Sequence, residues 1–452
     1  METQNTLLNQ YMATRRQTMR LAEGLSAEDL TAQSMPDASP GKWHLAHTTW
    51  FFETFILQKF SPNFEWFNPH FCHLFNSYYE SVGSRHARPQ RGLLTRPALD
   101  QVIEYRQHVD TLMHRAMECE PEVLAPLVTI GLHHEMQHQE LFLTDILHLL
   151  WHSPMFPSVI NVAASTSTSG AKQQGSPEYE TKNRSSNPSP VSMQAFEGGL
   201  IEVGVTDELN KGEQTSANDC WTNFSFDCER PRHTTFVHPF RLASRLVNNG
   251  EWLEFMRDGG YQNALLWLSD GWSRCQMEGW DTPLYWLQRD GGWLQFGLDG
   301  LREIDLLAPV CHVSYYEADA FARWRQKRLP REHEWELAAA EKPIRGNFLE
   351  SCVWRPLTDN SPTVSAALAG SRVDDLYGDV WEWTQSAYAP YPGFQAGQGA
   401  LGEYNGKFMA NQCVLRGGSC VTPLQQMRTS YRNFFYPHQR WQFSGLRLAE
   451  DL

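Results

Sequence analysis

The sequence predicts an α+β protein with two domains, an N-terminal helical bundle and a C-terminal domain of short strands and helices. Apolar residues recur at helical spacing up to residue 157, and Ser, Thr, Gly and Pro dominate the segment 158–193. From residue 194 the chain is rich in Trp and Gly, with short segments between paired glycines. A length of 452 residues suits two or three domains. We therefore expect domains at 1–157 and 194–452, joined by a linker at 158–193.

Four helices are expected in the N-terminal domain. Their predicted ranges are 5–25, then 41–59 after Ser39-Pro40-Gly41, then 95–119 with Thr95 as the cap, and finally 126–152, opened by Pro126. Four-helix bundles commonly hold metal or ligand sites in their core. The long insertion at 62–96 shows neither a helical nor a strand pattern, and loops of that length are usually functional.

The C-terminal domain is expected to contain one clear helix, at 315–326. Ser314 can cap it, and Glu317 stands at the third position of the same capping box.

Composition excludes several classes of protein. A hydrophobic content of 41% and a charged content of 20% exclude global disorder, and a net charge of −14 argues against a nucleic-acid partner. No apolar run reaches the roughly 20 residues of a membrane span, and the N-terminus has no apolar signal core. The nine cysteines form no C-x-x-C pair, which favours reduced thiols. We expect a cytoplasmic enzyme with small-molecule substrates.

The strongest chemical signal is the run from His133 to Glu140. On a helix His134 and His138 lie one turn apart and share a face, and the apolar stripe turns that face toward the bundle core. Two imidazoles in a core are costly unless they have partners. A shared metal ion would provide one.

Other interpretations of these histidines stay open from spacing alone. They can be core histidines bonded to carboxylates. The run also matches H-E-x-x-H, the zinc-protease pattern, with Glu135 as general base. No third ligand follows at a familiar protease spacing, but His47, on the helix at 41–59, offers a third imidazole, and His44 lies one turn from it. Three neutral nitrogens leave open positions on iron, zinc or nickel.

Several long motifs carry a resemblance to a known family. The segments "GKWHLAHTTWFFETFIL", "LFNSYYESVGSRHARPQRGLLTRP" and "HHEMQHQE" resemble the iron-dependent sulfoxide synthases of ergothioneine biosynthesis. The segments "LYGDVWEWT", "RGGSC" and "RNFFYPHQRWQFSGLRLA" resemble a formylglycine-generating-enzyme (sulfatase-modifying-factor) domain, related to C-type lectins, and the N-terminal half resembles a DinB-type bundle. The resemblance covers nearly the whole chain outside the linker.

This resemblance implies an activity and a metal. The family couples a thiol to the imidazole of hercynine, using O2 and one non-haem Fe(II), and its product is a sulfoxide. By motif match its three iron-binding histidines correspond to His47, His134 and His138.

The resemblance also implies roles in catalysis and hercynine binding. The branch with the "SYYE" motif uses a tyrosine as a proton or hydrogen donor, which corresponds to Tyr79 with Tyr78 beside it, although both can simply pack on the bundle. Another branch takes its tyrosine from the C-terminal domain, where Tyr388 and Tyr391 lie. Asn433 resembles the asparagine that holds the carboxylate of hercynine. Gln137, between the two helical ligands, can reach the same substrate, or can instead orient a ligand imidazole.

The sulfur donor is expected to be free L-cysteine, with γ-glutamylcysteine a poor or secondary donor. Phe434 and Phe435 can form an apolar or cation–π wall for a quaternary ammonium group, or belong to the core. The best-known branch has an aspartate in place of Phe435 and uses it to bind γ-glutamylcysteine, whose α-ammonium group an apolar residue cannot pair with. Arg88 and Arg91 are candidates for the cysteine carboxylate, or are part of a solvated basic loop.

Three alternative functions remain at this level. One is an ovothiol-type enzyme that uses histidine, or a selenium-inserting relative. Another is a redox-inactive DinB-type thiol transferase or hydrolase that uses zinc or nickel. The third is a carbohydrate- or ligand-binding module. Cys420 follows "RGGS" without a second cysteine nearby, so we expect it to be structural.

Overall fold

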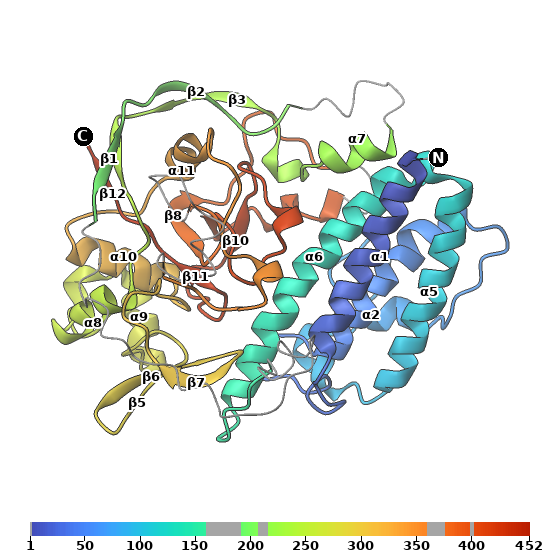
Figure 1. Ribbon diagram of the computed structural model, residues 1–452, viewed down its shortest axis with the longest axis horizontal. Coiled ribbons are helices and arrows are strands. Elements are labelled where there is room, and N and C mark those ends of the chain that lie inside the picture. The colour runs from blue at the N-terminus through green and yellow to red at the C-terminus, as the bar shows by residue number, and fades with distance from the viewer. Residues whose placement is uncertain (1, 160–190, 207–215, 359–375, 398–401) are drawn as a thin grey trace, which may run out of the picture.

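The computed structural model describes residues 2–159, 191–206, 216–358, 376–397 and 402–452. A helical bundle and an α+β domain lie side by side along the long axis of the molecule (Figure 1), which confirms the predicted fold class. The predicted linker lies almost wholly outside the described residues.

Four long helices form the bundle (Figure 1): α1 (Glu2–Ala22), α2 (Gly41–Phe52), α5 (Leu99–Cys119) and α6 (Pro121–Trp151). Helix α2 continues through a π-helical turn, Glu53–Leu57, into α3 (Gln58–Phe60), so the predicted helix at 41–59 is confirmed. The insertion that follows contains α4 (Phe71–Leu74) and a 3₁₀ helix, Arg88–Leu93.

Two predicted helix starts are wrong. Helix α5 begins at Leu99 rather than at Thr95, because a proline at 97 disfavours helical backbone at the residue before it. Helix α6 begins at Pro121. Proline is favourable there because the N–H groups of the first turn have no partner within the helix. Pro126, the predicted start, therefore lies inside α6.

The strands of the C-terminal domain form small sheets of two to four strands in the described residues. One has the order β1–β4–β12, and the largest has the order β10–β9–β8–β11, in which β11 pairs with β8 in parallel. The others are β2–β3 and β5–β6–β7. The strands are β1 (Met193–Phe196), β2 (Gly199–Val203), β3 (His233–Val237), β4 (Phe240–Ala243), β5 (Trp286–Arg289), β6 (Gly292–Gly297), β7 (Gly300–Glu303), β8 (Trp381–Ala387), β9 (Cys413–Arg416), β10 (Asn433–Phe435), β11 (Ser444–Gly445) and β12 (Ala449–Asp451).

In the described part of this domain, five short α-helices accompany the sheets: α7 (Ala217–Thr222), α8 (Asn249–Arg257), α9 (Ser269–Glu278), α10 (Tyr315–Trp324) and α11 (Glu332–Ala339). Helix α10 confirms the predicted capping box. The Ser314 hydroxyl accepts from the N–H of Glu317 at 3.2 Å, and the Glu317 carboxylate accepts from the N–H of Ser314 at 2.8 Å.

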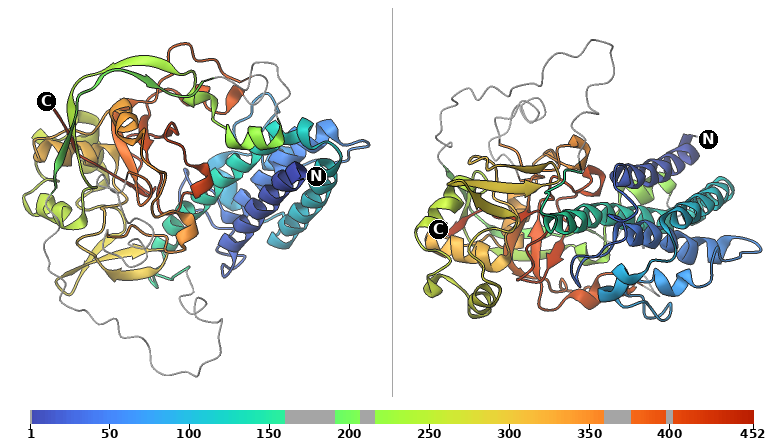
Figure 2. Two further views of the ribbon diagram at one scale, coloured as in Figure 1. Left: turned by 45° about the horizontal axis from the view of Figure 1, so that its top comes forward. Right: turned by 90° about the horizontal axis from the view of Figure 1, so that it is seen from below.

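Helix α6 lies at the border between the domains (Figures 1 and 2). Its Glu140 carboxylate accepts hydrogen bonds from Trp381 Nε1 at 2.5 Å and from Thr422 Oγ1 at 2.7 Å, both in the C-terminal domain. Its His133 ring stacks on Phe224 with 3.9 Å between ring centroids. Two side chains of α6 thus fasten the bundle to its neighbour.

A second connection, which we call the Glu403 clamp, joins the loop after α4 to the C-terminal domain. The carboxylate of Glu403 accepts from the N–H of Glu80 at 3.0 Å and from the N–H of Ser81 at 2.9 Å. The Lys407 ammonium donates to the same carboxylate at 2.8 Å and also to the carbonyl of Tyr78. The clamp therefore fixes the backbone around Tyr78.

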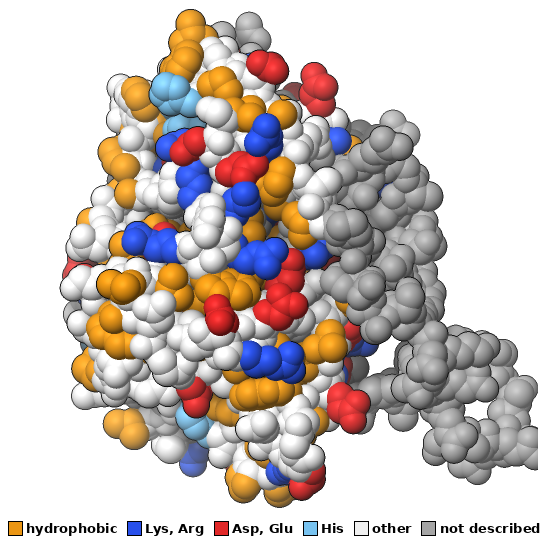
Figure 3. Space-filling view, turned by 90° about the vertical axis from the view of Figure 1, so that its left-hand side faces the viewer, with side chains coloured by type: hydrophobic (Ala, Val, Ile, Leu, Met, Phe, Trp, Pro, Cys, Tyr) orange, Lys and Arg blue, Asp and Glu red, His pale blue; other side chains and the backbone are white. Residues whose placement is uncertain are grey.

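On the face of the C-terminal domain farthest from the bundle, basic and acidic side chains are interspersed (Figure 3). Among the described helices, none combines the length and the apolarity that a membrane crossing requires.

Removal of the Glu403 carboxylate should loosen the loop after α4 that carries Tyr78 and Tyr79, which we call the tyrosine loop. In Glu403→Ala we expect amide hydrogen exchange at Glu80 and Ser81 to become about tenfold faster, because a hydrogen bond to a charged group contributes roughly 1.5 kcal/mol or more. Mass spectrometry of peptic fragments would measure this. The control is Glu278→Ala. Like Glu403, which pairs with Lys407, Glu278 pairs with a cation four residues away, in this case Arg274. Unchanged exchange at both amides would contradict the clamp.

Candidate metal centre

Three histidines from two helices converge at one point. His47 lies on α2 and His134 and His138 on α6, and one ring nitrogen from each lies within 4.8 Å of the others. The Nε2 atoms of His47 and His134 are 3.1 Å apart. Two nitrogens bound to one ion at about 2.1 Å, at near right angles, have roughly this separation. The geometry therefore suits a shared first-row metal ion.

The far nitrogens of two rings have hydrogen-bond partners. Nδ1 of His47 lies 2.6 Å from the carbonyl oxygen of Phe75, and Nδ1 of His138 lies 2.8 Å from Nδ1 of His44. Nδ1 of His134 is buried without a partner in the described structure. A carbonyl only accepts, so His47 carries its proton on Nδ1 and presents a bare Nε2 to the other two rings.

The environment keeps these imidazoles neutral. Burial lowers the pKa of His134 to about 3, and it holds the pKa values of His47 and His138 well below their usual range. Neutral imidazoles are the form that binds metal. The donor set and its protonation state therefore fit a divalent ion such as Fe(II).

Glu135 points away from this centre, so the zinc-protease interpretation is wrong. Its carboxylate accepts from Arg15 at 2.8 Å, from Arg106 at 2.9 Å and from the Thr18 hydroxyl at 2.6 Å. Burial alone would raise the pKa of Glu135, but the two guanidinium groups lower it to about 2. A carboxylate fixed in ion pairs with Arg15 of α1 and Arg106 of α5 cannot act as base at the metal.

The tyrosine pair of the insertion packs beside the centre. Tyr79 is fully buried, and its ring lies 5.7 Å from that of Trp50, which stacks on His47 at 5.4 Å. Tyr78 stacks on Tyr79 at 4.6 Å. Burial raises the pKa of Tyr79 well above its usual range, and its hydroxyl has no hydrogen-bond partner among the described residues. A buried neutral phenol is therefore available close to the ligands.

Sequence reasoning missed two further tyrosines. Tyr404 lies 5.8 Å from His134, centroid to centroid, and its hydroxyl donates to the side-chain oxygen of Gln137. The amide of Gln137 donates in turn to the hydroxyl of Tyr431 at 2.9 Å. No local motif marks either tyrosine, because each reaches the centre only through the packing of the two domains. Gln137, which was predicted, therefore faces the C-terminal domain.

Arg91 and Arg88 occupy different environments. Arg91 is buried, lies 3.4 Å over the ring of Trp43, and donates to the Ser39 hydroxyl at 2.9 Å. Trp43 stacks on His47 at 4.5 Å, so this guanidinium is close to the centre. Arg91 makes no ion pair within the described structure, and burial lowers its pKa well below the usual range. Arg88 is exposed and donates to the carbonyl of Asp37.

Strand β10 carries the predicted residues Asn433, Phe434 and Phe435, all half-buried. Alternation along a strand places Asn433 and Phe435 on one face and Phe434 on the other. Phe434 stacks on Tyr388 at 4.0 Å and lies 6.1 Å from Phe408, which in turn contacts the ring of Tyr78 at 5.1 Å. The face of β10 that carries Phe434 therefore points toward the tyrosine loop, through Phe408.

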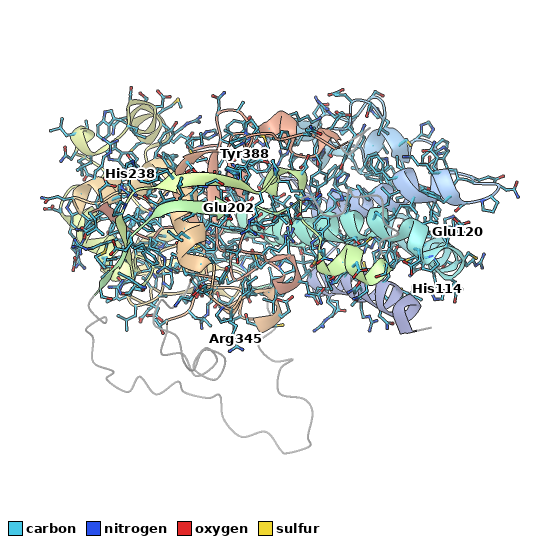
Figure 4. All side chains as sticks on the ribbon, turned by 90° about the horizontal axis from the view of Figure 1, so that it is seen from above. His114, Glu120, Glu202, His238, Arg345 and Tyr388 are labelled. Carbon is cyan, nitrogen blue, oxygen red and sulfur yellow. The ribbon has the colours of Figure 1, made fainter. Side chains whose placement is uncertain are left out.

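The other tyrosine candidates lie within the C-terminal domain. Figure 4 labels Tyr388 there, where it is buried behind Phe434. Tyr391 lies in a buried charged cluster, with its hydroxyl 3.3 Å from an amino nitrogen of Arg416. Cys420 is fully buried in a hydrophobic cluster, as a structural residue would be.

Comparisons with known proteins agree with this architecture. Residues 10–142 match the DinB superfamily, and residues 176–452 match the Sulfatase-modifying factor enzyme 1-like domain. A hercynine oxygenase from Mycolicibacterium smegmatis is 30% identical, over 99% of this chain and 99% of its own length. A hercynine oxygenase from Mycobacterium tuberculosis is 36% identical over 50% of this chain and 56% of that protein. A formylglycine-generating enzyme from the same organism is 27% identical over 36% of this chain.

A DinB bundle that carries a three-histidine centre, joined to a sulfatase-modifying-factor domain, defines a two-domain metal-dependent oxygenase. The match to a hercynine oxygenase along the full length of the chain identifies a particular family within that class. The chain belongs to the hercynine oxygenase family.

Loss of any one of the three ligands should abolish stable metal binding. We expect His47→Ala, His134→Ala and His138→Ala to retain far less iron than the roughly one ion per chain of the parent protein, because two imidazoles hold a divalent ion weakly. Elemental analysis after anaerobic Fe(II) loading would measure this. His133→Ala is the matched control, since its ring stacks on Phe224 instead. Full iron content in His134→Ala would refute the assignment.

Proposed function

We propose that the protein is an iron(II)- and O2-dependent sulfoxide synthase of ergothioneine biosynthesis. It joins the sulfur of L-cysteine to the imidazole carbon of hercynine. The observation that carries the proposal is the convergence of three neutral imidazoles, two buried and one half-buried, in the bundle beside the C-terminal domain. The balance requires one O2. The C–H and S–H bonds break, a C–S bond forms, one oxygen atom joins the sulfur, and the other leaves as water.

Iron held by His47, His134 and His138 would supply open coordination positions for the thiol sulfur and for activation of O2. The protein supplies binding, orientation and protons around it. The bundle provides the ligands and the tyrosine loop, while the C-terminal domain provides Tyr404 and the residues of β10.

Arg91 is the best placed residue to bind the cysteine carboxylate. Its guanidinium is buried close to His47 and lacks an anionic partner in the described structure. A carboxylate would pair with it through charge-assisted hydrogen bonds. Arg88, three residues earlier and exposed, can approach the same anion from the solvent side. This arrangement supports a small amino-acid thiol as the sulfur donor.

Hercynine would lie between Gln137 and β10. The Gln137 side chain is held by Tyr404 and Tyr431, which leaves it fixed rather than mobile. Asn433 can hold the carboxylate, and Phe435, on the same face of β10, offers an aromatic face to the trimethylammonium group, whereas Phe434 lies on the other face. Phe435 brings no charge for the α-ammonium group of γ-glutamylcysteine, which favours free cysteine.

Tyr79 acts as the proton or hydrogen donor, with Tyr78 stacked behind it. A phenol held neutral by burial can donate either a proton or a hydrogen atom. Tyr404 contacts His134 from the opposite domain and serves as the second candidate for this role.

The decisive assay is product formation from defined substrates. After anaerobic Fe(II) loading, hercynine and cysteine should give a coupled sulfoxide, detected by mass spectrometry, only when O2 is added. Histidine in place of hercynine should react poorly. With γ-glutamylcysteine we expect kcat/KM at least about tenfold lower, because a lost charged contact costs roughly 1.5 kcal/mol or more.

Three results would change the assignment. A preference for γ-glutamylcysteine would overturn the donor. A preference for histidine would indicate an ovothiol-type enzyme. Thiol transfer without O2 would indicate a redox-inactive transferase.

Replacing one tyrosine at a time by phenylalanine should show whether Tyr79 or Tyr404 is the donor. In Tyr79→Phe the rate of sulfoxide formation should fall by about 10²–10⁴-fold, because the donor is lost while the ring remains. Iron content should stay unchanged. Tyr404→Phe is the matched comparison, and we expect a smaller loss. If Tyr404→Phe showed the larger loss, the donor would be Tyr404.

A further inference from the structure

A chain of polar groups continues behind one of the three ligands. Nδ1 of His138 lies 2.8 Å from Nδ1 of His44, and Nε2 of His44 lies 3.0 Å from Oδ2 of Asp145. The same oxygen accepts from the N–H of Ser39 at 2.8 Å. His44, Asp145 and Ser39 are all buried. The contacts run from the start of α2, through α6, to the ligand.

These contacts determine where each proton lies. The shared oxygen of Asp145 accepts from Ser39 and can only accept again, so His44 must carry its proton on Nε2. His138 can bind a metal ion only through Nε2, because its Nδ1 faces His44. In that state Nδ1 of His138 carries the proton and donates to Nδ1 of His44, so the hydrogen bonds from His138 through His44 to Asp145 hold the ring with Nε2 free for the ion.

The three ligands differ in this respect. His47 is fixed by the backbone carbonyl of Phe75. His134 has no partner for its far nitrogen among the described residues. His138 alone is fixed through a second imidazole and a carboxylate, so its orientation and basicity depend on two other side chains.

We propose that His44 and Asp145 are positioning residues that set the tautomer and orientation of His138 for metal binding. The inference rests on the metal centre of the proposed function, but not on its substrates or its product. Partners of this kind orient a ligand ring and increase its basicity.

Metal affinity gives the first test. The full-length protein, free of metal, is titrated with Co(II) in competition with a chelator, and the visible spectrum of the bound ion is recorded. We expect His44→Phe to weaken Co(II) binding by roughly 10–100-fold and to alter the spectrum. Asp145→Leu should do the same. Asp145→Asn keeps an oxygen toward Ser39 and His44, and should restore most of the affinity.

The matched control is His133→Phe, the same substitution in a buried histidine of α6 that stacks on Phe224. It should change Co(II) affinity less than twofold. Equal affinity and an unchanged spectrum in His44→Phe would overturn the proposal, as would a loss in His133→Phe as large as that in His44→Phe.

A second measurement needs no variant that could fail to fold. In metal-free protein labelled with ¹⁵N-histidine, NMR should show His138 protonated on Nδ1 and His44 on Nε2. His138 protonated on Nε2 would overturn the proposal. These readouts are independent of turnover: failure to form a sulfoxide would sink the proposed substrates and leave the positioning role intact.

Discussion

A helix that is buried along most of its length cannot leave its buried polar side chains without partners, and α6 is such a helix. Glu135 reaches the bundle and pairs with Arg15 and Arg106, while Glu140 reaches the other way to Trp381 and Thr422. His134 and His138 face α2. Each of these side chains requires a complement from a different segment. The positions of both domains, and of the metal ligands between them, follow from satisfying that one helix.

This constraint also separates structural charges from functional ones. Glu135 and Arg91 are both charged and buried near the centre, yet their surroundings differ. Glu135 has two guanidinium partners and is fully used by the fold. Arg91 has an indole and a hydroxyl but no carboxylate within the described structure. A buried cation without an anion carries a cost that a substrate carboxylate relieves, so the unpaired group is the one expected to bind a ligand.

Local patterns were sufficient for the fold class and for the shared face of His134 and His138, whereas the choice of His47 rested on the family resemblance. The four-residue spacing of His134 and His138 defined one face, and "WHLAH" offered His47. Helix starts were less secure, because Pro97 and Pro126 are compatible with more than one register. The contacts of Tyr404, Tyr431 and Glu403 could not be foreseen, since they depend on how the two domains pack. Spacing also left His44 and His47 equivalent. Only their contacts in the structure distinguish His47, which faces His134, from His44, which contacts Asp145 and His138.

The distances along the chain give the Glu403 clamp a kinetic meaning. His47 and His134 are 87 residues apart, whereas Glu80 and Glu403 are 323 apart and Gln137 and Tyr431 are 294 apart. Contacts between distant segments close late, and domains generally fold as units, the N-terminal one first during synthesis. The ligand cluster can therefore form while the rest of the chain is still being made. The C-terminal domain, which brings Tyr404, Tyr431 and the Glu403 clamp to the ligand cluster, folds last.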